Sequence, residues 1–328
     1  MRAAWFERFG AAEDALVVGE QPVPVAGTGE VLVRLSASGV NPSDVKKRAG
    51  SFANLLDGGL VIPHSDGAGI IEAVGEDVSE ARVGERVWVY QAQFARRFGT
   101  AAEYVALDQS RAVTLPDTAS FAVGACMGIP CMTAHRCVYA DGDVDGSTIL
   151  VTGGAGRVGH YAIQWAKLGG ARVIATASAA RDEASCREVG ADAVVNHREA
   201  DWANAVLAAN DGIPVDRVVD VEFGANLEQV LNCIRTSGVI ATYSSMQVAE
   251  PKLPFFRMLY MDLDIQIVIV YAMPEAAKRH AITDITAALE EGQLVHRVAH
   301  ELPLDAIARS HRLIEDGGFR GCVVVSLD

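Results

Sequence analysis

The 328-residue sequence has few of the features that would place it with membrane, secreted or nucleic-acid-binding proteins. Its apolar run at residues 267–273 is far too short to cross a bilayer, and its first ten residues lack the apolar core of a signal peptide. Basic residues are also in deficit: 28 lysines and arginines face 42 aspartates and glutamates, a formal net charge of −14. Because nucleic-acid binding requires a clustered excess of basic side chains, we expect neither a nucleic-acid nor a membrane partner.

Cysteine is scarce as well, with six residues, no CxxC pair, and so no sign of a disulfide framework. We expect reduced, mostly buried thiols in a cytoplasmic protein. The cysteines at 126, 131 and 137 form the one cluster, but they lack the spacing of a zinc site. We therefore expect no bound metal.

The arrangement of apolar segments predicts two domains of different texture. Roughly the first 120 residues are β-rich, with short alternating runs such as 30–40 and 86–92 between Gly, Pro and Asp turns. From Ser147 onward, apolar strands alternate with helical segments, which is typical of βαβ units around a parallel sheet. After an amphipathic helix at 274–291 the tail is strand-like again, and we expect it to pair with the first block.

Four glycines fall within residues 153–159, between the apolar strand TILVTG and the helical pattern RVGHYAIQWAKLGG. Gly154, Gly156 and Gly159 have the GxGxxG spacing, which is weak evidence alone but is strengthened by its strand–turn–helix setting. Bare backbone there lets a pyrophosphate approach the unpaired N–H groups of the helix N-terminus. The alternative is a tight turn without a ligand.

The end of the following strand indicates which dinucleotide binds. An NAD site carries an acidic residue about 20 positions past the glycines, to bond the ribose 2′-hydroxyl. Residues 176–178 read Thr-Ala-Ser instead, and Arg181 follows, while Asp182 and Glu183 are expected to begin the next helix. A small hydroxyl residue followed by a cation suits a 2′-phosphate, so we predict NADP (NADPH).

Several blocks of the chain, in order, resemble the quinone oxidoreductase (zeta-crystallin-like) family of zinc-free medium-chain dehydrogenases/reductases. The landmarks are GVNPSDVKKRAG (39–50), SDGAGIIEAVGEDV (65–78), GTAAEYVAL (99–107), LPDTASFAVGACMGIPCMTAHR (115–136), the glycine loop and GADAVVNHRE (190–199). The resemblance implies an α/β fold, with a GroES-like catalytic domain at 1–123 completed by 291–328 and a Rossmann NADP-binding domain at 124–290. It also implies a homodimer through the Rossmann domain, in which a strand at 265–271 extends the sheet.

Zinc-bearing relatives carry Cys at the place of Asn41 and His at the place of Ser65, together with a four-cysteine lobe near residues 90–110. All of these ligands are missing from this sequence. Without them no Lewis-acid zinc can polarise an alcohol, which weighs against alcohol dehydrogenase chemistry. His64 is a lone imidazole, for which we expect a surface or capping role.

The resemblance assigns site residues by position. Asn41 and Asp44 lie at the nicotinamide and substrate end, although Asp44 equally suits a helix N-terminal cap. Lys46 replaces a typical Tyr and resembles members that reduce the C=C bond of α,β-unsaturated carbonyls; its alternative is a solvated lysine. Including the glycine loop, the positions expected to contact NADPH are Asn41, Phe52, Thr133, Gly153, Gly154, Ala155, Gly156, Arg157, Val158, Gly159, Thr176, Ser178, Arg181, His197, Asn226, Tyr243, Ser244, Ser245, Val268, Ile269 and Val270.

The resemblance implies a zinc-independent reductase that transfers hydride from NADPH to a quinone or an α,β-unsaturated carbonyl. One alternative is an alkenal/enone C=C reductase with little quinone activity. An alternative from another class is an NADPH-binding structural or regulatory protein without turnover.

Overall fold

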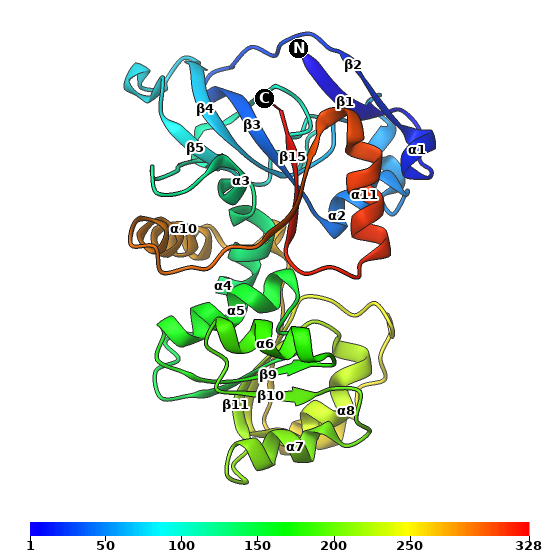
Figure 1. The fold of residues 1–328 in the computed structure, drawn as a ribbon, viewed down its shortest axis with the longest axis vertical. Helices are drawn as coiled ribbons and strands as arrows, with labels where there is room; N and C mark the ends of the chain where they lie inside the picture. Colours follow the sequence, from blue (N-terminus) through cyan, green and yellow to red (C-terminus); the bar gives the residue numbers. More distant parts are fainter. Residues whose placement is uncertain (328) are drawn as a thin grey trace. The chain divides into compact units, whose positions relative to one another are not determined.

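The computed structural model describes residues 1–327 and separates the chain into two compact units (Figure 1). Unit 1 consists of Met1–Ile129 and Ile282–Asp328, so both ends of the chain contribute to it. Unit 2 consists of Pro130–Ala281.

Unit 1 is built on a seven-stranded sheet in the order β14-β15-β3-β4-β5-β7, with β6 pairing to β3, and a separate pair β1-β2. Its strands are β1 (Arg2–Phe6), β2 (Leu16–Glu20), β3 (Glu30–Val40), β4 (Asp66–Val74), β5 (Arg86–Val89), β6 (Tyr104–Asp108), β7 (Ala112–Thr114), β14 (Val298–Pro303) and β15 (Cys322–Ser326). Its helical segments are α1 (Ala12–Ala15), α2 (Pro42–Arg48), η1 (Ala53–Leu56), η2 (Glu80–Arg82), η3 (Gln109–Arg111), α3 (Phe121–Gly124), η6 (Leu304–Ala306) and α11 (Ile307–Asp316).

The C-terminal strand joins the sheet formed by the N-terminal block. β15 runs antiparallel to β3, with Val324 opposite Gly39, which confirms the predicted pairing of tail and first block. The alternating strand β3 buries Val31, Val33 and Leu35 in the core of the sheet. Helix α11 was not predicted from the sequence; it packs against β15 and α2.

Unit 2 contains a parallel six-stranded sheet in the order β10-β9-β8-β11-β12-β13. Its strands are β8 (Thr148–Val151), β9 (Arg172–Ala177), β10 (Ala193–Asn196), β11 (Val215–Asp220), β12 (Ile234–Thr242) and β13 (Asp264–Ile267). Its helices are α4 (Met132–Tyr139), α5 (Arg157–Leu168), α6 (Ala180–Glu188), α7 (Trp202–Ala209), α8 (Phe223–Cys233) and α9 (Phe255–Tyr260), with a 3-10 turn η5 (Val270–Ala272). A π-helical turn η4 (Met127–Cys131) and helix α10 (Glu275–Glu290) contain the points where the chain passes between units.

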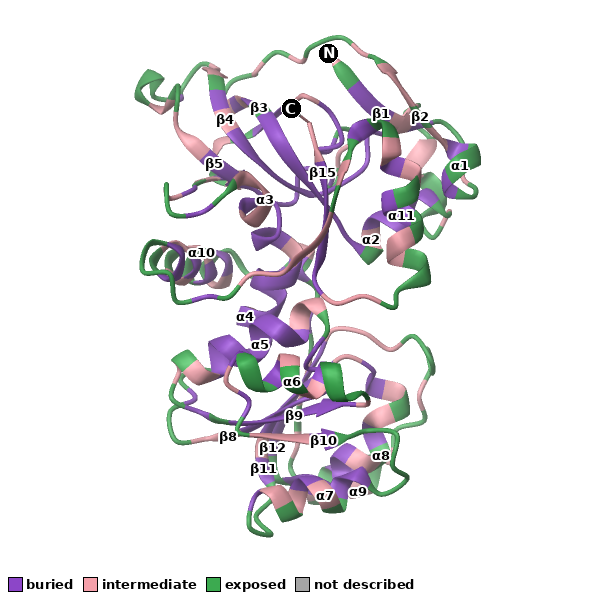
Figure 2. Ribbon diagram, viewed as in Figure 1, coloured by how far each residue is buried: buried purple, intermediate pink, exposed green. Residues whose placement is uncertain are grey.

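The apolar runs predicted as strands occupy the centre of this sheet. Figure 1 shows α5 and α6 on one face and α7 and α8 on the other, and Figure 2 shows the buried residues gathered in the strands and the helix faces on them. Leu150, Ile174, Val218 and Ile240 are fully buried there, because both faces of a parallel sheet are covered. The six strands confirm the predicted alternation, with one correction. The strand expected at 265–271 ends at Ile267, because the chain turns at η5 to enter α10.

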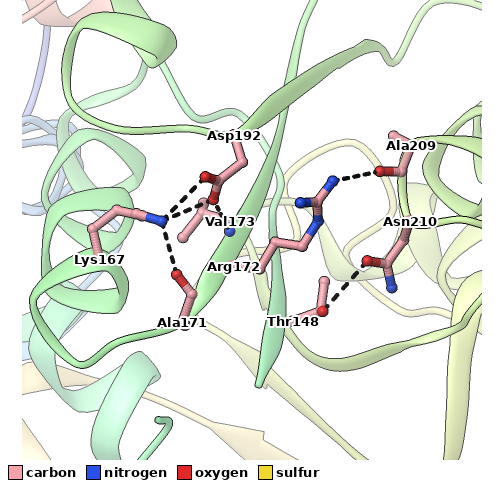
Figure 3. A network of polar contacts seen from close by, with 8 residues as sticks. All are labelled: Thr148, Lys167, Ala171, Arg172, Val173, Asp192, Ala209 and Asn210. Carbon is pink, nitrogen blue, oxygen red and sulfur yellow. Dashed lines mark hydrogen bonds and ion pairs between the residues drawn. The ribbon is translucent and has the colours of Figure 1, made fainter. Parts of the chain in front are cut away.

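Polar contacts fix the amino-terminal edge of this sheet (Figure 3). Lys167 donates to both Asp192 carboxylate oxygens, at 2.9 and 3.2 Å, and Asp192 Oδ2 accepts the Val173 N–H at 2.7 Å. Arg172 donates to the carbonyl of Ala209 at 2.9 Å. These side chains connect the ends of helices to the starts of strands. The opposite, carboxyl-terminal edge of the same strands carries the glycine loop.

Within residues 1–327 no helix combines the length and the apolar character that crossing a membrane requires. All six cysteines are buried, as expected.

Candidate functional site

The glycine loop links β8 to α5 as the sequence predicts. Gly153 has φ +61°, a conformation that favours glycine, and Gly156 is the N-cap of α5. Glycine has no side chain to cap the helix, so the N-cap position itself does not block the first-turn N–H groups from a ligand. Because the sheet order reverses between β8 and β11, this loop also lies at the position where open α/β sheets bind ligands.

The three motif glycines differ in what a side chain would meet. A Cβ on Gly154 would lie 2.8 Å from the Ala175 Cβ, and one on Gly159 would lie 2.4 Å from the Gly153 carbonyl oxygen. Those two glycines allow the helix to pack tightly against the loop and the strand. A Cβ on Gly156 would meet only the Gly153 oxygen, at 3.1 Å. Gly156 is therefore the position left open to a ligand, which fits the approach of a pyrophosphate.

The predicted adenosine-side residues follow the carboxyl ends of β9, which neighbours β8, and of β10, the next strand outward. Ser178 comes directly after β9 and His197 directly after β10, and the two strands pair with Asn196 opposite Ala177. Arg181 is exposed in the first turn of α6, where Asp182 and Glu183 also lie as predicted. Arg198, which was not predicted from the sequence, is exposed beside His197. Burial lowers the pKa of His197, and the Arg198 charge acts in the same direction.

Thr176 has a structural contact that the sequence did not reveal. Its hydroxyl accepts the Gly153 N–H at 3.0 Å, and its carbonyl accepts the Gly154 N–H at 3.0 Å. The residue is buried and fixes the glycine turn from the neighbouring strand.

Two buried acids organise the loops after β11 and β12. Asp220 Oδ1 accepts hydrogen bonds from the Thr152 hydroxyl at 2.6 Å and the Asn226 amide at 2.8 Å, and burial raises the Asp220 pKa. Glu222 accepts the N–H groups of Met246 and Gln247 at 2.8 and 3.0 Å. Asn226 was predicted from the sequence, whereas Asp220 and Glu222 were not.

The two serines predicted in this region also bind backbone N–H groups. The Ser244 carbonyl accepts the Phe223 N–H at 3.0 Å, and Ser245 Oγ accepts the Gly224 N–H at 2.9 Å. Tyr243 lies just before them, and its N–H donates to the Asp220 carbonyl at 3.2 Å.

Three other predicted positions differ in exposure. Phe52 precedes η1 and is 54% exposed, whereas Thr133 in α4 is buried. Val268 and Val270 are buried and Ile269 is 57% exposed. The Val268 N–H donates to the Thr242 carbonyl at 2.7 Å, so it continues the sheet ladder past the end of β13.

In unit 1, Asn41 and Asp44 form the start of α2. The Asn41 N–H donates to Asp44 Oδ2 at 2.8 Å, the carboxylate half of a capping box. The Asn41 side chain donates to Asp66 Oδ2 at 2.8 Å. All three residues are buried. Asp66 was not predicted, since nothing in the sequence spacing brings β4 beside α2.

The basic run after this motif contains one exposed and one buried lysine. Lys46 is exposed, whereas Lys47 is 8% exposed and donates to the Gln93 carbonyl at 3.0 Å. Burial lowers the Lys47 pKa, while the nearby Asp44 and Asp66 carboxyl groups oppose that shift. Helical spacing could have indicated that Lys47 is the buried lysine, because position 47 shares a helix face with position 44 and position 46 does not.

The expectation for His64 was wrong. His64 is fully buried, with Nδ1 2.8 Å from Ser38 Oγ and Nε2 3.0 Å from Nε2 of His311. Burial lowers the pKa of His64 to about 3, and the Lys47 charge acts in the same direction. An isolated histidine in a sequence gives no sign of a buried partner 247 positions away.

A pocket of about 300 Å³ lies between α4 and the start of α10, lined by residues that include His135, Tyr139, Pro274 and His280. None of the predicted site residues lines it.

Comparison with known proteins matches both parts of the chain. The alcohol dehydrogenase GroES-like domain family matches residues 27–117, and the zinc-binding dehydrogenase family matches residues 158–287. A human quinone oxidoreductase is 28% identical over 331 residues, covering 100% of this chain and 98% of the human protein.

Two solved structures are similar along the whole chain. One, an NAD-dependent alcohol dehydrogenase, has 31% identity and a TM-score of 0.86, with 100% of each chain covered. The other, a mycobacterial protein complexed with NADPH, has 27% identity and a TM-score of 0.87, covering 99% of this chain and 100% of its own. These matches confirm the predicted α/β fold with GroES-like and Rossmann domains.

Proposed function

The chain belongs to the medium-chain dehydrogenase/reductase family of oxidoreductases, and we propose that it transfers hydride from NADPH to a quinone or an α,β-unsaturated carbonyl. The observation that carries this proposal is the glycine loop of unit 2. Gly156 leaves the N-terminus of α5 open at the reversal point of the parallel sheet, where a dinucleotide pyrophosphate fits.

The residues divide the work of the proposed reaction between binding and orientation. The bound cofactor would supply the hydride, and the N–H groups at the start of α5 would hold its pyrophosphate. Ser178, Arg181 and His197 would hold the adenosine end. Asn41 would orient the nicotinamide and substrate, and the Lys46 ammonium would stabilise negative charge that develops on a substrate carbonyl oxygen.

The direct test is an NADPH-oxidation panel with benzoquinone, naphthoquinone, a ring enone and a short alkenal. We expect turnover of a quinone or the enone that survives EDTA, because Asn41 and Ser65 supply neither thiolate nor imidazole to a catalytic zinc. Loss of rate on chelation, restored by zinc, would overturn the zinc-independent form of the proposal. If NADPH protects the protein from heat but no acceptor is reduced, the non-enzymatic alternative replaces it.

Cofactor choice is expected to follow the absence of an acid after β9. NADPH should bind at least about tenfold more tightly than NADH, equivalent to about 1.4 kcal/mol. Arg181→Ala should narrow that difference and leave NADH affinity unchanged, because a cation at this position serves only the 2′-phosphate. Titration of both cofactors by calorimetry measures the ratio, with Arg187→Ala in the last turn of the same helix as the control. Equal wild-type affinities would contradict the prediction.

Lys46 distinguishes the two substrate classes. Lys46→Met should reduce kcat on an enone, because the stabilising ammonium is removed. The loss should be limited to about tenfold, since an exposed ammonium is partly screened by water. The loss on naphthoquinone should be smaller, since the hydroquinone anion is already delocalised. Steady-state kinetics on both substrates with Lys252→Met as the control measures the difference. Equal small effects would assign Lys46 to the solvated surface and favour quinone reduction; a selective loss would favour the enone reductase alternative.

We also propose a cytoplasmic homodimer that pairs through unit 2. Strand β13 lies at an edge of the sheet, and Ile267 is 82% exposed. Helix α9, just before β13 in the same chain, adds Phe255, Phe256 and Tyr260, which are 65, 69 and 83% exposed. So much exposed apolar surface around an open strand edge is typical of an association face.

Ile267→Arg should convert the dimer to a monomer, because the edge would carry an unpaired charge into the interface. Sedimentation velocity measures the change, and Ile213→Arg, at an exposed position in the same unit, is the control. A monomeric wild type, or a variant that remains dimeric, would contradict this interface.

A further inference from the structure

Asp66 is a fully buried carboxyl group that no sequence motif assigned. It is the first residue of β4, and its Oδ2 accepts two hydrogen bonds, from Asn41 Nδ2 and from the Ile129 N–H, both at 2.8 Å. Its Oδ1 has no hydrogen-bond partner and packs against Gly128, where a Cβ would lie 2.1 Å from that oxygen. The glycine therefore leaves just enough room for this carboxyl group.

These contacts determine the orientation of Asn41. Asp44 holds its backbone N–H, Asp66 holds its side-chain nitrogen, and the capping box turns its side-chain oxygen away from Asp66 and toward the Asp44 N–H. The same Asp66 oxygen holds Ile129, within the π-helical turn η4 and next to the start of unit 2. Such turns occur frequently at functional sites. One carboxyl group thus fixes both the predicted nicotinamide contact and the peptide that leads into the next unit.

The protonation of Asp66 follows from its surroundings. Burial raises its pKa to about 8, the Asp44 charge acts in the same direction, and the bonds from Ile129 and Asn41 and the charge of Lys47 oppose the shift. Near neutral pH the group is mostly protonated. Since Oδ2 accepts two N–H groups, the proton resides on Oδ1. Ionisation would leave Oδ1 charged, buried and without a donor, which favours a rearrangement of the carboxylate.

We propose that Asp66 is a positioning residue of the reaction, holding the Asn41 amide in its working orientation while the carboxyl group is neutral. The inference rests on the proposed function, in which Asn41 contacts the nicotinamide and substrate. It adds that kcat falls as Asp66 ionises, and that the fall requires Asn41.

The kinetic test measures NADPH oxidation from pH 6 to 9.5 in the wild type and in Asp66→Asn, which retains an oxygen acceptor and cannot ionise. We expect the wild-type kcat to fall through a midpoint near 8 and the variant to lack that fall. Glu72→Gln, an exposed change of the same charge on β4, should behave as the wild type. An identical pH profile in wild type and Asp66→Asn would overturn the inference.

A double-mutant cycle separates positioning from general damage. Asp66→Ala should lower kcat by about tenfold when Asn41 is present and by less than about twofold in an Asn41→Ala background. The effects are not additive because both substitutions remove the same hydrogen bond. Equal losses in both backgrounds would overturn the inference. If Asp66→Ala does not fold, Asp66→Asn still decides through its pH profile.

A measurement without turnover distinguishes failure of this inference from failure of the proposed function. In protein labelled with ¹⁵N-asparagine, the Asn41 side-chain amide signals, assigned with Asn41→Ala, should titrate near pH 8 in the wild type and stay constant in Asp66→Asn. If these signals titrate but no acceptor is reduced, the proposed function fails and the Asp66 contact stands. If an acceptor is reduced and the signals do not titrate, the positioning inference fails alone.

Discussion

Gly156→Val should weaken NADPH binding by about 100-fold or more while leaving the folded structure almost as stable as the wild type, because only the ligand position is filled. Gly156 has φ −72° and ψ 168°, extended values that a valine adopts readily, and its Cβ would meet a single oxygen at 3.1 Å. The branched side chain would instead stand over the N-terminus of α5, where the pyrophosphate must approach. The substitution therefore removes a binding surface without disturbing the packing of α5 on the sheet.

The matched control is Gly159→Ala, one turn further along the same helix. Its Cβ would lie 2.4 Å from the Gly153 carbonyl oxygen, so the loop must move, and we expect a clear loss of thermal stability. Calorimetric titration with NADPH and thermal unfolding, measured on both variants, distinguish the two effects. Wild-type affinity in Gly156→Val would show that the phosphates bind elsewhere on the chain.

The parts of the fold that sequence predicted correctly are those determined locally. The strand–glycine–helix segment at 148–168 follows from an apolar run, a glycine spacing and a helical period that all lie within one short stretch. The strand from 265 was extended too far, since apolar residues continue past Ile267 although the backbone turns there. Apolar character marked the burial of Val268 and Val270 but not their conformation.

The candidate site in unit 1 depended on contacts between distant parts of the chain. Asn41 and Asp44 were found because they share a motif, but their buried partner Asp66 lies 25 positions from Asn41, on another element. Lys46 was likewise predicted from the motif alone, whereas the buried lysine of α2 is its neighbour Lys47. Motif matching identifies a segment, whereas the face of a short helix that becomes buried is decided by the sheet beneath it.

The buried histidine pair is a second feature of this kind, and its hydrogen bonds fix both tautomers. The Thr100 hydroxyl donates to the Asp66 carbonyl at 2.6 Å, so it must accept from Ser38, 2.8 Å away. Ser38 must then accept from Nδ1–H of His64, which leaves His64 Nε2 as an acceptor. His311 therefore donates through Nε2–H at 3.0 Å, and its Nδ1 has no partner. Both rings are neutral in the folded protein.

The neutral pair makes the folded state sensitive to acid. Burial lowers the pKa of His64 to about 3, and burial and the neighbouring His64 lower the pKa of His311 well below its usual value. In the unfolded chain each ring takes up a proton near pH 6.5. The contribution of the two histidines to stability is therefore fully present above about pH 6.5 and is lost as pH falls below it. Between pH 7 and 5 the pair lowers the free energy of unfolding by about 4 kcal/mol.

Asp66 acts in the opposite direction over the same range. Its folded pKa of about 8 lies above the unfolded value, so its contribution to stability is lost as pH rises and regained as pH falls below 8. The regain is about 1.4 kcal/mol per pH unit, which offsets more than half of the histidine effect between pH 7 and 5. The wild-type curve will therefore fall less than the histidine pair alone would cause, and single variants are needed to reveal the opposing contributions.

His311→Gln should make the protein relatively more stable to acid, because glutamine can donate to His64 Nε2 and does not titrate. Between pH 7 and 5 its free energy of unfolding should fall by about 2 kcal/mol less than that of the wild type, the share of one buried histidine. Urea unfolding at several pH values measures this difference, and His300→Gln, at a partly exposed position in the same unit, is the control. Parallel pH curves for His311→Gln and the wild type would show that the pKa of His311 is the same in the folded and unfolded protein, and would contradict the prediction.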